Sequence, residues 1–445
     1  MLNNMQQFDY LIIGAGPGGY ETAAAAAANG ASVALVERDK LGGTCLNCGC
    51  IPTKAMAHAA DILREAREGA LYGINAEPNV DFARLCQRRE EVVGQLREGI
   101  EALMGRVTVI RGEARFVGAK EVEIEVADAE AIRATADKII IATGSAPAAL
   151  PIPGAENAMS SDQLLAMTEL PESMVIIGGG VIGMEFASIF ATLGVKVTVV
   201  EYCKEILTQF DKDIAKRLRT QLAAAGIDFL LGAAVTAIEP GRVVYELKGK
   251  QESVEAEKIV MAVGRRPVLP EGLDLAGVEL DRKAIRVDRT TMETSSSGVY
   301  AIGDVNAICM LAHAASAQGR RVLGEEVNLD VIPSVVFTHP ELAMVGASEQ
   351  QLKDAEVEYK SVKSLFRGNG KAVSMNETSG MVKLLYSPAD GQILGCAIMG
   401  PHAADMIEEV AVAMANRLPV AAIAQTIHPH PTLCEALLTA AMQVR

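Results

Sequence analysis

One short pattern occurs twice in the chain, with its parts in the same order. Residues 9–19, DYLIIGAGPGG, and residues 174–183, MVIIGGGVIG, each lead from an apolar, strand-like stretch into a Gly-x-Gly-x-x-Gly turn. A second apolar stretch then ends in an acid, Glu37 in the first copy and Glu201 in the second, at the same distance from the first glycine. Because strand, turn, helix, strand and acid form the dinucleotide-binding unit of doubly wound sheets, the sequence predicts two such units.

The glycines of the two turns have separate tasks. They are Gly14, Gly16 and Gly19 in the first copy and Gly178, Gly180 and Gly183 in the second. The first two allow a tight turn and let backbone amides approach a pyrophosphate at a helix N-terminus, and the third lets that helix pack closely on the sheet. Two glycine-rich turns that hold no ligand are the alternative, which the duplicated context disfavours.

Composition excludes several other classes of protein. Half of the 445 residues are apolar and 22% are charged, which is globular composition rather than that of a disordered or fibrous chain. No apolar run reaches the roughly 18 to 20 residues of a membrane helix. A net charge of −15 argues against a nucleic-acid partner. The first eight residues contain no Lys or Arg, so we expect no secretory signal and a cytoplasmic protein.

Breaks rich in proline and glycine divide the chain. AALPIPG at 148–154 and PVLPEG at 267–272 flank the second glycine motif, and strand-like and helical runs alternate in the last hundred or so residues. We predict a first nucleotide-binding domain at 1–147 that is completed by 268–331, a second at 148–267 and an α+β domain at 332–445.

Three of the eight cysteines lie close together in LGGTCLNCGCIPTK at 41–54. Cys45 and Cys50 are near enough for a small disulfide ring and stand at or near an expected helix start, where the helix dipole lowers a thiol pKa. This favours a redox-active pair over a structural disulfide in a reducing compartment. Cys48 could join them as a metal ligand, but no fourth ligand follows at finger-like spacing, and we interpret His58 as an ordinary helix residue.

The thiol pair and the two nucleotide sites together imply two cofactors. A dithiol passes electron pairs by thiolate attack and nicotinamide carries hydride, and a flavin handles both. We therefore expect FAD and a nicotinamide coenzyme. The Glu201 carboxylate would accept hydrogen bonds from a ribose 2′-hydroxyl and repel a 2′-phosphate, which favours NAD; Lys204 alone is a poor substitute for a guanidinium clamp.

Further motifs carry a family resemblance. They are IATGSAP at 141–147, AVGRRP at 262–267, AIGD at 301–304 and HPHPTLCE at 428–435. With the glycine motifs and the cysteine run, the chain resembles the pyridine nucleotide-disulfide oxidoreductase flavoenzymes over essentially its whole length. The resemblance implies two Rossmann-like domains, for FAD and NAD, plus a C-terminal α+β dimerisation domain, a homodimer and a redox-active Cys45–Cys50 disulfide.

Three features favour the branch of this family that oxidises dihydrolipoamide. MLAH at 310–313 resembles that branch, Val181 stands where the glutathione branch has a tyrosine, and the tail holds the single Cys434 rather than an extra pair. Since the first glycine motif begins at Gly14, we expect the lipoyl group on a separate carrier protein. The alternatives are another disulfide reductase of the family and a non-catalytic flavoprotein docking subunit. The sequence does not indicate which enzyme assembly the protein serves.

The resemblance also assigns catalytic roles. Cys45 and Cys50 exchange disulfides; His430 is the acid/base, contributed across the dimer interface, and its bond to Pro431 is expected to be cis. Glu435 orients the imidazole, although Thr432-x-x-Glu435 also reads as a capping box. Lys54 and Glu185 pair beside the flavin, with a surface ion pair as the alternative. We interpret His339 and His428 as structural.

The remaining assignments concern cofactor contacts. Asp304 is expected to bind the ribityl or pyrophosphate region of FAD, Glu37 the adenosine ribose, and the backbone of Ala114 the adenine. The FAD residues are Gly14, Gly16, Gly19, Glu37, Lys54, Ala114, Thr143, Gly144, Ser145, Asp304, Met310, Leu311, Ala312 and His313. The NAD residues are Gly178, Gly180, Gly183, Glu201, Val235 and Gly264. Cys48 departs from the family pattern, and our hypothesis is that its side chain points away from the flavin.

Overall fold

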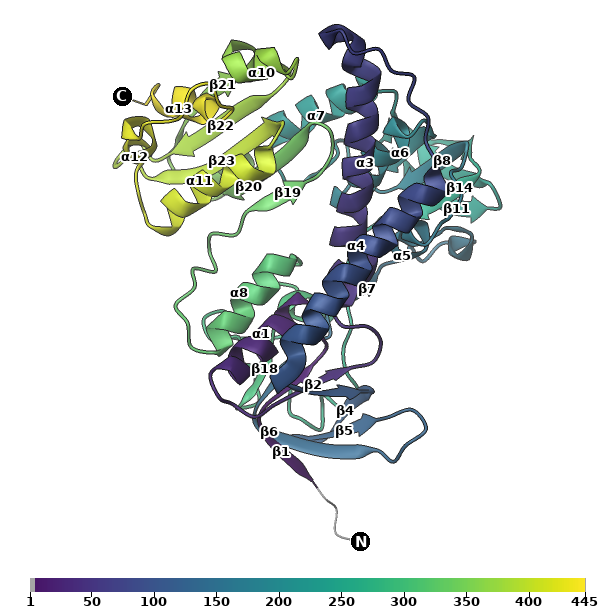
Figure 1. Ribbon diagram of the computed structural model, residues 1–445, viewed down its shortest axis with the longest axis vertical. Helices are drawn as coiled ribbons and strands as arrows, with labels where there is room; N and C mark the ends of the chain where they lie inside the picture. Colours follow the sequence, from purple (N-terminus) through teal and green to yellow (C-terminus); the bar gives the residue numbers. More distant parts are fainter. Residues whose placement is uncertain (1–4, 445) are drawn as a thin grey trace. The chain divides into compact units, whose positions relative to one another are not determined.

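The computed structural model describes residues 5–444, which form two compact units (Figure 1). The first unit contains residues 5–55, 83–148 and 265–329, and the second contains 56–82, 149–264 and 330–444. The division falls inside helix α3 (Cys50–Glu68) and at the start of helix α4 (Phe82–Leu103). Within residues 5–444, no helix is both long and apolar enough to cross a membrane.

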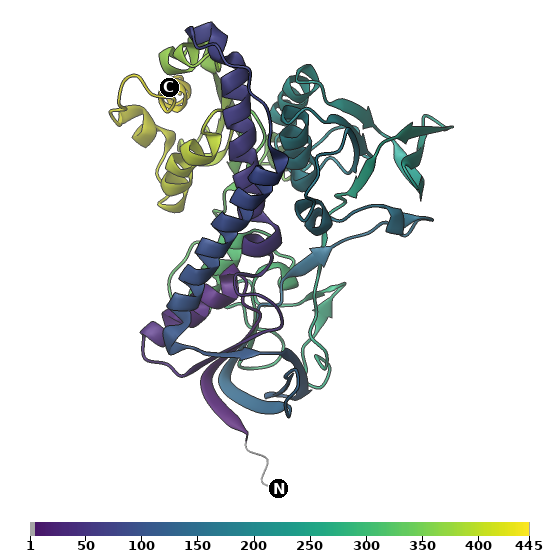
Figure 2. The ribbon, with the colours of Figure 1, turned by 45° about the vertical axis from the view of Figure 1, so that its right-hand side comes forward.

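The first unit is built on a sheet with a parallel core and an antiparallel extension. Its strands are β1 (Gln6–Ile13), β2 (Val33–Glu37), β3 (Thr108–Arg111), β4 (Glu113–Gly118), β5 (Glu121–Glu125), β6 (Ile132–Ile141) and β18 (Val299–Ala301). The order is β3-β2-β1-β6-β5-β4, and β18 also pairs with β6. Figure 2 shows the purple strand β1 beside the blue strands. The apolar runs of β1 and β6 are fully buried, as parallel strands covered on both faces require.

Helices α1 (Pro17–Ala28) and α8 (Ala312–Val322) pack against each other in the first unit (Figure 1). A Cβ at Gly18 would lie 3.1 Å from the Cβ of Ala315, so small residues let the two helices approach closely. Helix α2 (Gly43–Cys48) precedes α3. Short strands β7 (Ser145–Pro147) and β15 (Arg265–Pro267) pair where the chain leaves and re-enters this unit, and β16 (Leu280–Asp281) pairs with β17 (Ala284–Ile285).

The second unit repeats this plan. Its nucleotide-binding part contains strands β8 (Ser173–Ile177), β9 (Lys196–Glu201), β10 (Asp228–Leu231), β11 (Ala234–Glu239), β12 (Arg242–Leu247), β13 (Lys250–Glu255) and β14 (Lys258–Met261), with helices α5 (Ser161–Leu165), α6 (Val181–Thr192) and α7 (Lys212–Ala224). The parallel order β10-β9-β8-β14 corresponds to β3-β2-β1-β6, and the antiparallel sheet β11-β12-β13 accompanies it. The duplicated motif therefore reflects a duplicated fold.

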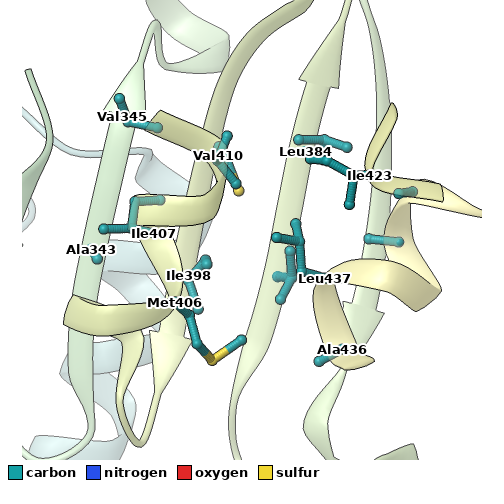
Figure 3. Close-up of a cluster of buried hydrophobic side chains, with 14 of the residues drawn as sticks. Ala343, Val345, Leu384, Ile398, Met406, Ile407, Val410, Ile423, Ala436 and Leu437 are labelled. Carbon is teal, nitrogen blue, oxygen red and sulfur yellow. The ribbon is translucent and has the colours of Figure 1, made fainter. Parts of the chain in front are cut away.

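The C-terminal part of the second unit is an antiparallel sheet of order β19-β20-β23-β22-β21 with helices packed on it. Its strands are β19 (Ser334–Val336), β20 (Glu341–Gly346), β21 (Lys360–Leu365), β22 (Met381–Tyr386) and β23 (Ile393–Gly400). Its helices are α9 (Glu349–Asp354), α10 (Gly370–Ser374), α11 (Ala403–Ala415), α12 (Val420–Gln425) and α13 (Glu435–Ala441). Figure 3 shows apolar side chains of α11 and α13 meeting those of the strands in one core. One Rossmann-like fold in each unit and the α+β domain at the C-terminus confirm the predicted fold class.

Candidate active site

The glycine turns leave no room for side chains at two positions of each copy. Gly14 has φ +103°, and a Cβ there would clash with the carbonyl oxygen of Ala142. A Cβ on Gly19 would clash with the carbonyl oxygen of Gly14. The second copy behaves in the same way at Gly178 (φ +111°) and Gly183. These glycines fix the turn and the seat of the helix on the strand, as the motif predicts.

The second glycine of each motif faces open space instead. Gly16 and Gly180 are the N-caps of α1 and α6, neither helix start has a side-chain cap or an acid in its first turn, and no heavy atom lies within 4 Å of a Cβ built on either glycine. Two helix N-termini thus present backbone amides to an uncovered position, which suits a pyrophosphate. The residues fit FAD and NAD.

The acid of each repeat contacts its own glycine turn. The Glu37 carboxylate accepts hydrogen bonds from the amides of Ala15 at 2.7 Å and Asp39 at 2.9 Å. The Glu201 carboxylate accepts from the amides of Gly179 and Cys203, the latter at 2.6 Å. Each carboxylate is oriented by these amides and keeps further lone pairs, and the bonds to ribose hydroxyls stay predictions.

The cysteine pair lies across a helix junction. Cys45 is in α2 and Cys50 is the first residue of α3, which confirms the expected helix start. The hydrogen bond with Cys50 and then burial raise the pKa of Cys45, while nearby Lys54 opposes the rise. The expected lowering by the helix dipole therefore does not apply to Cys45.

His430 and Glu435 form the second reactive pair. His430 Nδ1 lies 2.9 Å from Glu435 Oε1, and the imidazole is 79% exposed. The hydrogen bond from the amide of Thr432 and that from His430 lower the pKa of Glu435. The His430–Pro431 bond is cis, as expected.

The predicted capping box is only half right. Glu435 Oε2 accepts from the amide of Thr432 at 2.9 Å, but the Thr432 hydroxyl donates to the carbonyl oxygen of Pro429. Helix α13 begins at Glu435 itself, so Thr432 lies too early to cap it. Glu435 therefore combines a backbone contact with the histidine contact.

Several of the predicted FAD residues come together in the first unit. The Ser145 hydroxyl donates to Asp304 Oδ2 at 2.5 Å, and the Thr143 hydroxyl donates to the carbonyl oxygen of Val268 at 2.5 Å. Arg265 donates a hydrogen bond to Ser145 Oγ at 2.7 Å. This residue belongs to the AVGRRP motif but had no role among the sequence predictions. Gly144 has φ +68°, and Asp304 lies in the 3₁₀ turn Gly303–Asn306.

The other predicted contacts are more scattered. Met310 and Leu311 precede α8, Ala312 and His313 begin it, Ala114 lies in β4, Val235 lies in β11, and Gly264 has φ +107°. No FAD or NAD contact has been tested at these positions, which stay predictions.

Lys54 and Glu185 belong to different units, and their pairing stays a prediction. Glu185 is 5% exposed, and its Oε1 accepts a hydrogen bond from the amide of Phe337 at 3.0 Å. His428 contacts Glu409 Oε1 at 3.0 Å and the carbonyl oxygen of Thr426 at 2.9 Å. Such contacts suit the structural role expected of His428.

Comparisons with known proteins agree with this arrangement. Residues 8–319 match the family described as pyridine nucleotide-disulphide oxidoreductase, and residues 332–441 match its dimerisation domain. A dihydrolipoyl dehydrogenase of Chlamydia muridarum is 39% identical, covering 98% of this chain and 97% of that protein. Dihydrolipoyl dehydrogenase 3 of Pseudomonas aeruginosa is 39% identical, covering 99% of this chain and 98% of that protein.

Solved structures agree as well. LpdA from Mycobacterium tuberculosis has a TM-score of 0.90 and 28% identity, with 99% of this chain and all of that chain covered. The HOCl-induced flavoprotein disulfide reductase RclA from Escherichia coli, as a Cu(II) complex, has a TM-score of 0.88 and 30% identity, with 99% of this chain and all of that chain covered.

Proposed function

Because the chain belongs to the pyridine nucleotide-disulphide oxidoreductase family, we propose that it oxidises dihydrolipoamide to lipoamide and reduces NAD to NADH. It is an enzyme of a family that uses FAD and NAD(H). The observation that supports this substrate is the pair formed by His430 and Glu435, because a dithiol substrate needs a base that removes its thiol protons.

His430 removes a proton from one thiol of dihydrolipoamide. The resulting thiolate attacks Cys45 of the Cys45–Cys50 disulfide, the bond between the cysteines breaks, and Cys50 leaves as a thiolate. The second substrate thiol then attacks the substrate sulfur of the mixed disulfide, the bond to Cys45 breaks, and the Cys45 sulfur takes up the second thiol proton, so that lipoamide departs and both cysteines are reduced. FAD held at the first glycine turn would supply the redox chemistry that couples the reduced cysteine pair to NAD.

The neighbours of these groups have supporting tasks. Glu435 keeps His430 oriented and compensates the imidazolium charge. Lys54 favours the thiolate of the reduced pair, consistent with its opposing effect on the raised pKa of Cys45. Glu201 selects NAD by receiving the 2′-hydroxyl of the ribose. The contacts of Glu201 with the amides of Gly179 and Cys203 support this task.

We propose the same organisation as the sequence predicts. FAD binds to 1–147 with 268–331, NAD binds to 148–267, and 332–445 forms the interface of a homodimer, which the match to the dimerisation domain supports. The lipoyl group arrives on a separate carrier protein. The sparse cysteines support a cytoplasmic location.

The test is NADH production from dihydrolipoamide. Cys45→Ser should abolish it, and His430→Gln should reduce it by orders of magnitude. Two matched controls should retain it: Cys48→Ser, whose flavin–thiolate absorbance band should also be unchanged, and His402→Asn, which changes an exposed histidine at φ +56°. Activity that survives both Cys45→Ser and His430→Gln would contradict the mechanism. If the enzyme acts on another disulfide and not on lipoamide, the proposed substrate is wrong and the other disulfide takes its place.

A further inference from the structure

His430 lies in a short surface segment that links α12 to α13. Residues 426–431 have no regular secondary structure, and all of them are exposed except His428. Ile427 is 95% exposed and the His430 side chain is 79% exposed, whereas the His428 side chain is 5% exposed. Because no helix or strand fixes the backbone here, the position of His430 depends on the side chains that tie the segment to the rest of the domain.

His428 ties this segment to α11 through its ring. Its Nε2 lies 3.0 Å from Glu409 Oε1, and its Nδ1 lies 2.9 Å from the carbonyl oxygen of Thr426. Both partners are acceptors, so a ring with one N–H serves one of them and a ring with two serves both. The contact with Glu409 bridges 19 residues of sequence and joins the surface segment to a helix.

The helix at the other end of this contact is held by the core. Ile407 and Val410 flank Glu409 in α11 and are 1% and 0% exposed. Figure 3 shows both side chains in the apolar core, together with Ile423 of α12. Close packing in a core restricts movement, so α11 gives His428 a firm attachment point.

A second anchor lies on the other side of His430. Asn369 is 7% exposed, and its Nδ2 donates to the carbonyl oxygen of Thr432 at 2.9 Å, while its side-chain oxygen caps α10. The amide of Thr432 in turn holds Glu435. His430 thus lies between two anchored points, His428 two residues before it and Thr432 two residues after it.

The charges also connect His428 with the reactive pair. The hydrogen bond from the Thr432 amide and then that from His430 lower the pKa of Glu435, and positive charges on His430 and on His428 act in the same direction. His428 therefore lies near enough to the carboxylate that orients His430 for its charge to act there.

We propose that His428 is a positioning residue for His430, because its contact with Glu409 fixes the segment from which the catalytic imidazole projects. This inference rests on the proposed function in so far as His430 removes a thiol proton from dihydrolipoamide. The His428 side chain is buried, so it acts through the segment and not by touching the substrate. A displacement of about 1 Å at a catalytic group can cost about 10²-fold in rate, so the loss of this anchor should be measurable.

The first test follows the position of His430 without any substrate. Nuclear magnetic resonance of the FAD-loaded protein with isotope-labelled histidine reports on the six histidines, and the signal that His430→Gln removes belongs to His430. His428→Ala and Glu409→Ala should each move this signal. Since Glu409→Ala removes no ring, its effect cannot arise from the loss of a neighbouring aromatic group.

Two control variants accompany this measurement. Glu409→Gln keeps an acceptor oxygen of the same reach, so it should leave the His430 signal in place. Glu408→Ala is the matched control for Glu409→Ala, because it removes an exposed side chain from the adjacent position of α11. It should leave the signal unchanged as well.

The second test measures rates. His428→Ala and Glu409→Ala should lower kcat for dihydrolipoamide oxidation by about 10²-fold and leave KM for NAD unchanged. The reduction of ferricyanide by NADH should keep its wild-type rate, because this acceptor has no thiol protons and needs no base. In the His430→Gln background the same substitutions should cause no further loss, as expected if they act through His430.

A folded Glu409→Ala variant with the wild-type His430 signal or the wild-type kcat would overturn the proposal. Equal losses of both reactions would overturn it too, because they would indicate general destabilisation. Should His428→Ala fail to fold, Glu409→Ala removes the same contact from the helix side and decides the question. A displaced His430 signal in an enzyme that does not oxidise dihydrolipoamide would leave the anchoring role standing and remove only the proposed function.

Discussion

His430 Nδ1 and Glu435 Oε1 lie 2.9 Å apart, and the other oxygen of this carboxylate is held by the amide of Thr432. The lowered pKa of Glu435 keeps it ionised, so the neutral imidazole places its proton on Nδ1 and leaves Nε2 as the base. The geometry sets the tautomer that the proposed reaction needs.

This tautomer leads to the first prediction. Glu435→Gln should lower kcat for dihydrolipoamide oxidation by about 10²-fold or more, because the amide cannot stabilise the imidazolium, as expected for the support of a general base. Steady-state kinetics check this effect. An unchanged kcat would show that Glu435 serves only the Thr432 amide.

The second prediction distinguishes glycines that leave space for a ligand from glycines that the fold itself requires. Gly16→Ala should fold with nearly the wild-type stability, because no heavy atom lies within 4 Å of the new Cβ, and yet retain FAD poorly. Gly180→Ala should behave in the same way toward NADH. Gly19→Ala should instead destabilise the first unit, because its Cβ would clash with the carbonyl oxygen of Gly14. Flavin content, NADH titration and thermal melting check these outcomes; full FAD retention in Gly16→Ala would contradict the first.

Both glycine positions were readable from the sequence, because turn chemistry and strand periodicity are local properties. The presence of two nucleotide-binding folds followed from the repeated motif in the same way, whereas their strand orders were not predicted. The contact between Ser188 and His339 was not readable, since it joins positions 151 residues apart through a backbone amide that carries no sequence signal. The raised pKa of Cys45 was missed for a related reason: burial and a neighbouring thiol outweigh the local helix dipole.

The third prediction concerns a buried lysine that the sequence did not single out. Lys383 is 1% exposed, and its Nζ lies 2.9 Å from Asp211, 3.0 Å from Asp213 and 2.6 Å from Glu349. Lys383→Met should lower the free energy of unfolding by about 3 to 5 kcal/mol, because it leaves the buried Asp211 without its cation. Urea unfolding measures this. Lys353→Met, which breaks the pair between the exposed Lys353 and Glu349, should change it far less.

The carboxylates around Lys383 also make the free energy of unfolding depend on pH in acid. Hydrogen bonds from Lys363 and Lys383 lower the pKa of Asp213 to about 2, and those from Lys383 and Tyr359 lower that of Glu349 to about 2. A lowered pKa stabilises the fold above the unfolded value and loses this effect as pH falls toward the folded value. The difference between wild type and Lys383→Met should therefore shrink from pH 4.5 toward pH 2. A difference that does not change with pH would contradict the ionic origin.

The last prediction concerns Glu377, where the sign is opposite. Burial raises the pKa of Glu377 from 4.5 to about 7, although Arg64 opposes the rise. The folded protein therefore holds this proton more tightly, and the free energy of unfolding decreases as pH rises from 4.5 to 7. Glu377→Gln removes the decrease, so the variant should gain about 2 kcal/mol relative to wild type between pH 4.5 and 8. The titration of His339 is present in both proteins and largely cancels.

Urea unfolding of both proteins at pH 4.5, 6 and 8 checks this gain. Glu408→Gln is the control, because it removes an exposed carboxylate of α11 that is not among the charges acting on Glu377, and its effect should vary little over the three pH values. A Glu377→Gln difference that is equally flat would mean that Glu377 is already ionised at pH 4.5. In that case Arg64, rather than burial, would determine its charge, since an ion pair lowers a carboxyl pKa and desolvation raises it.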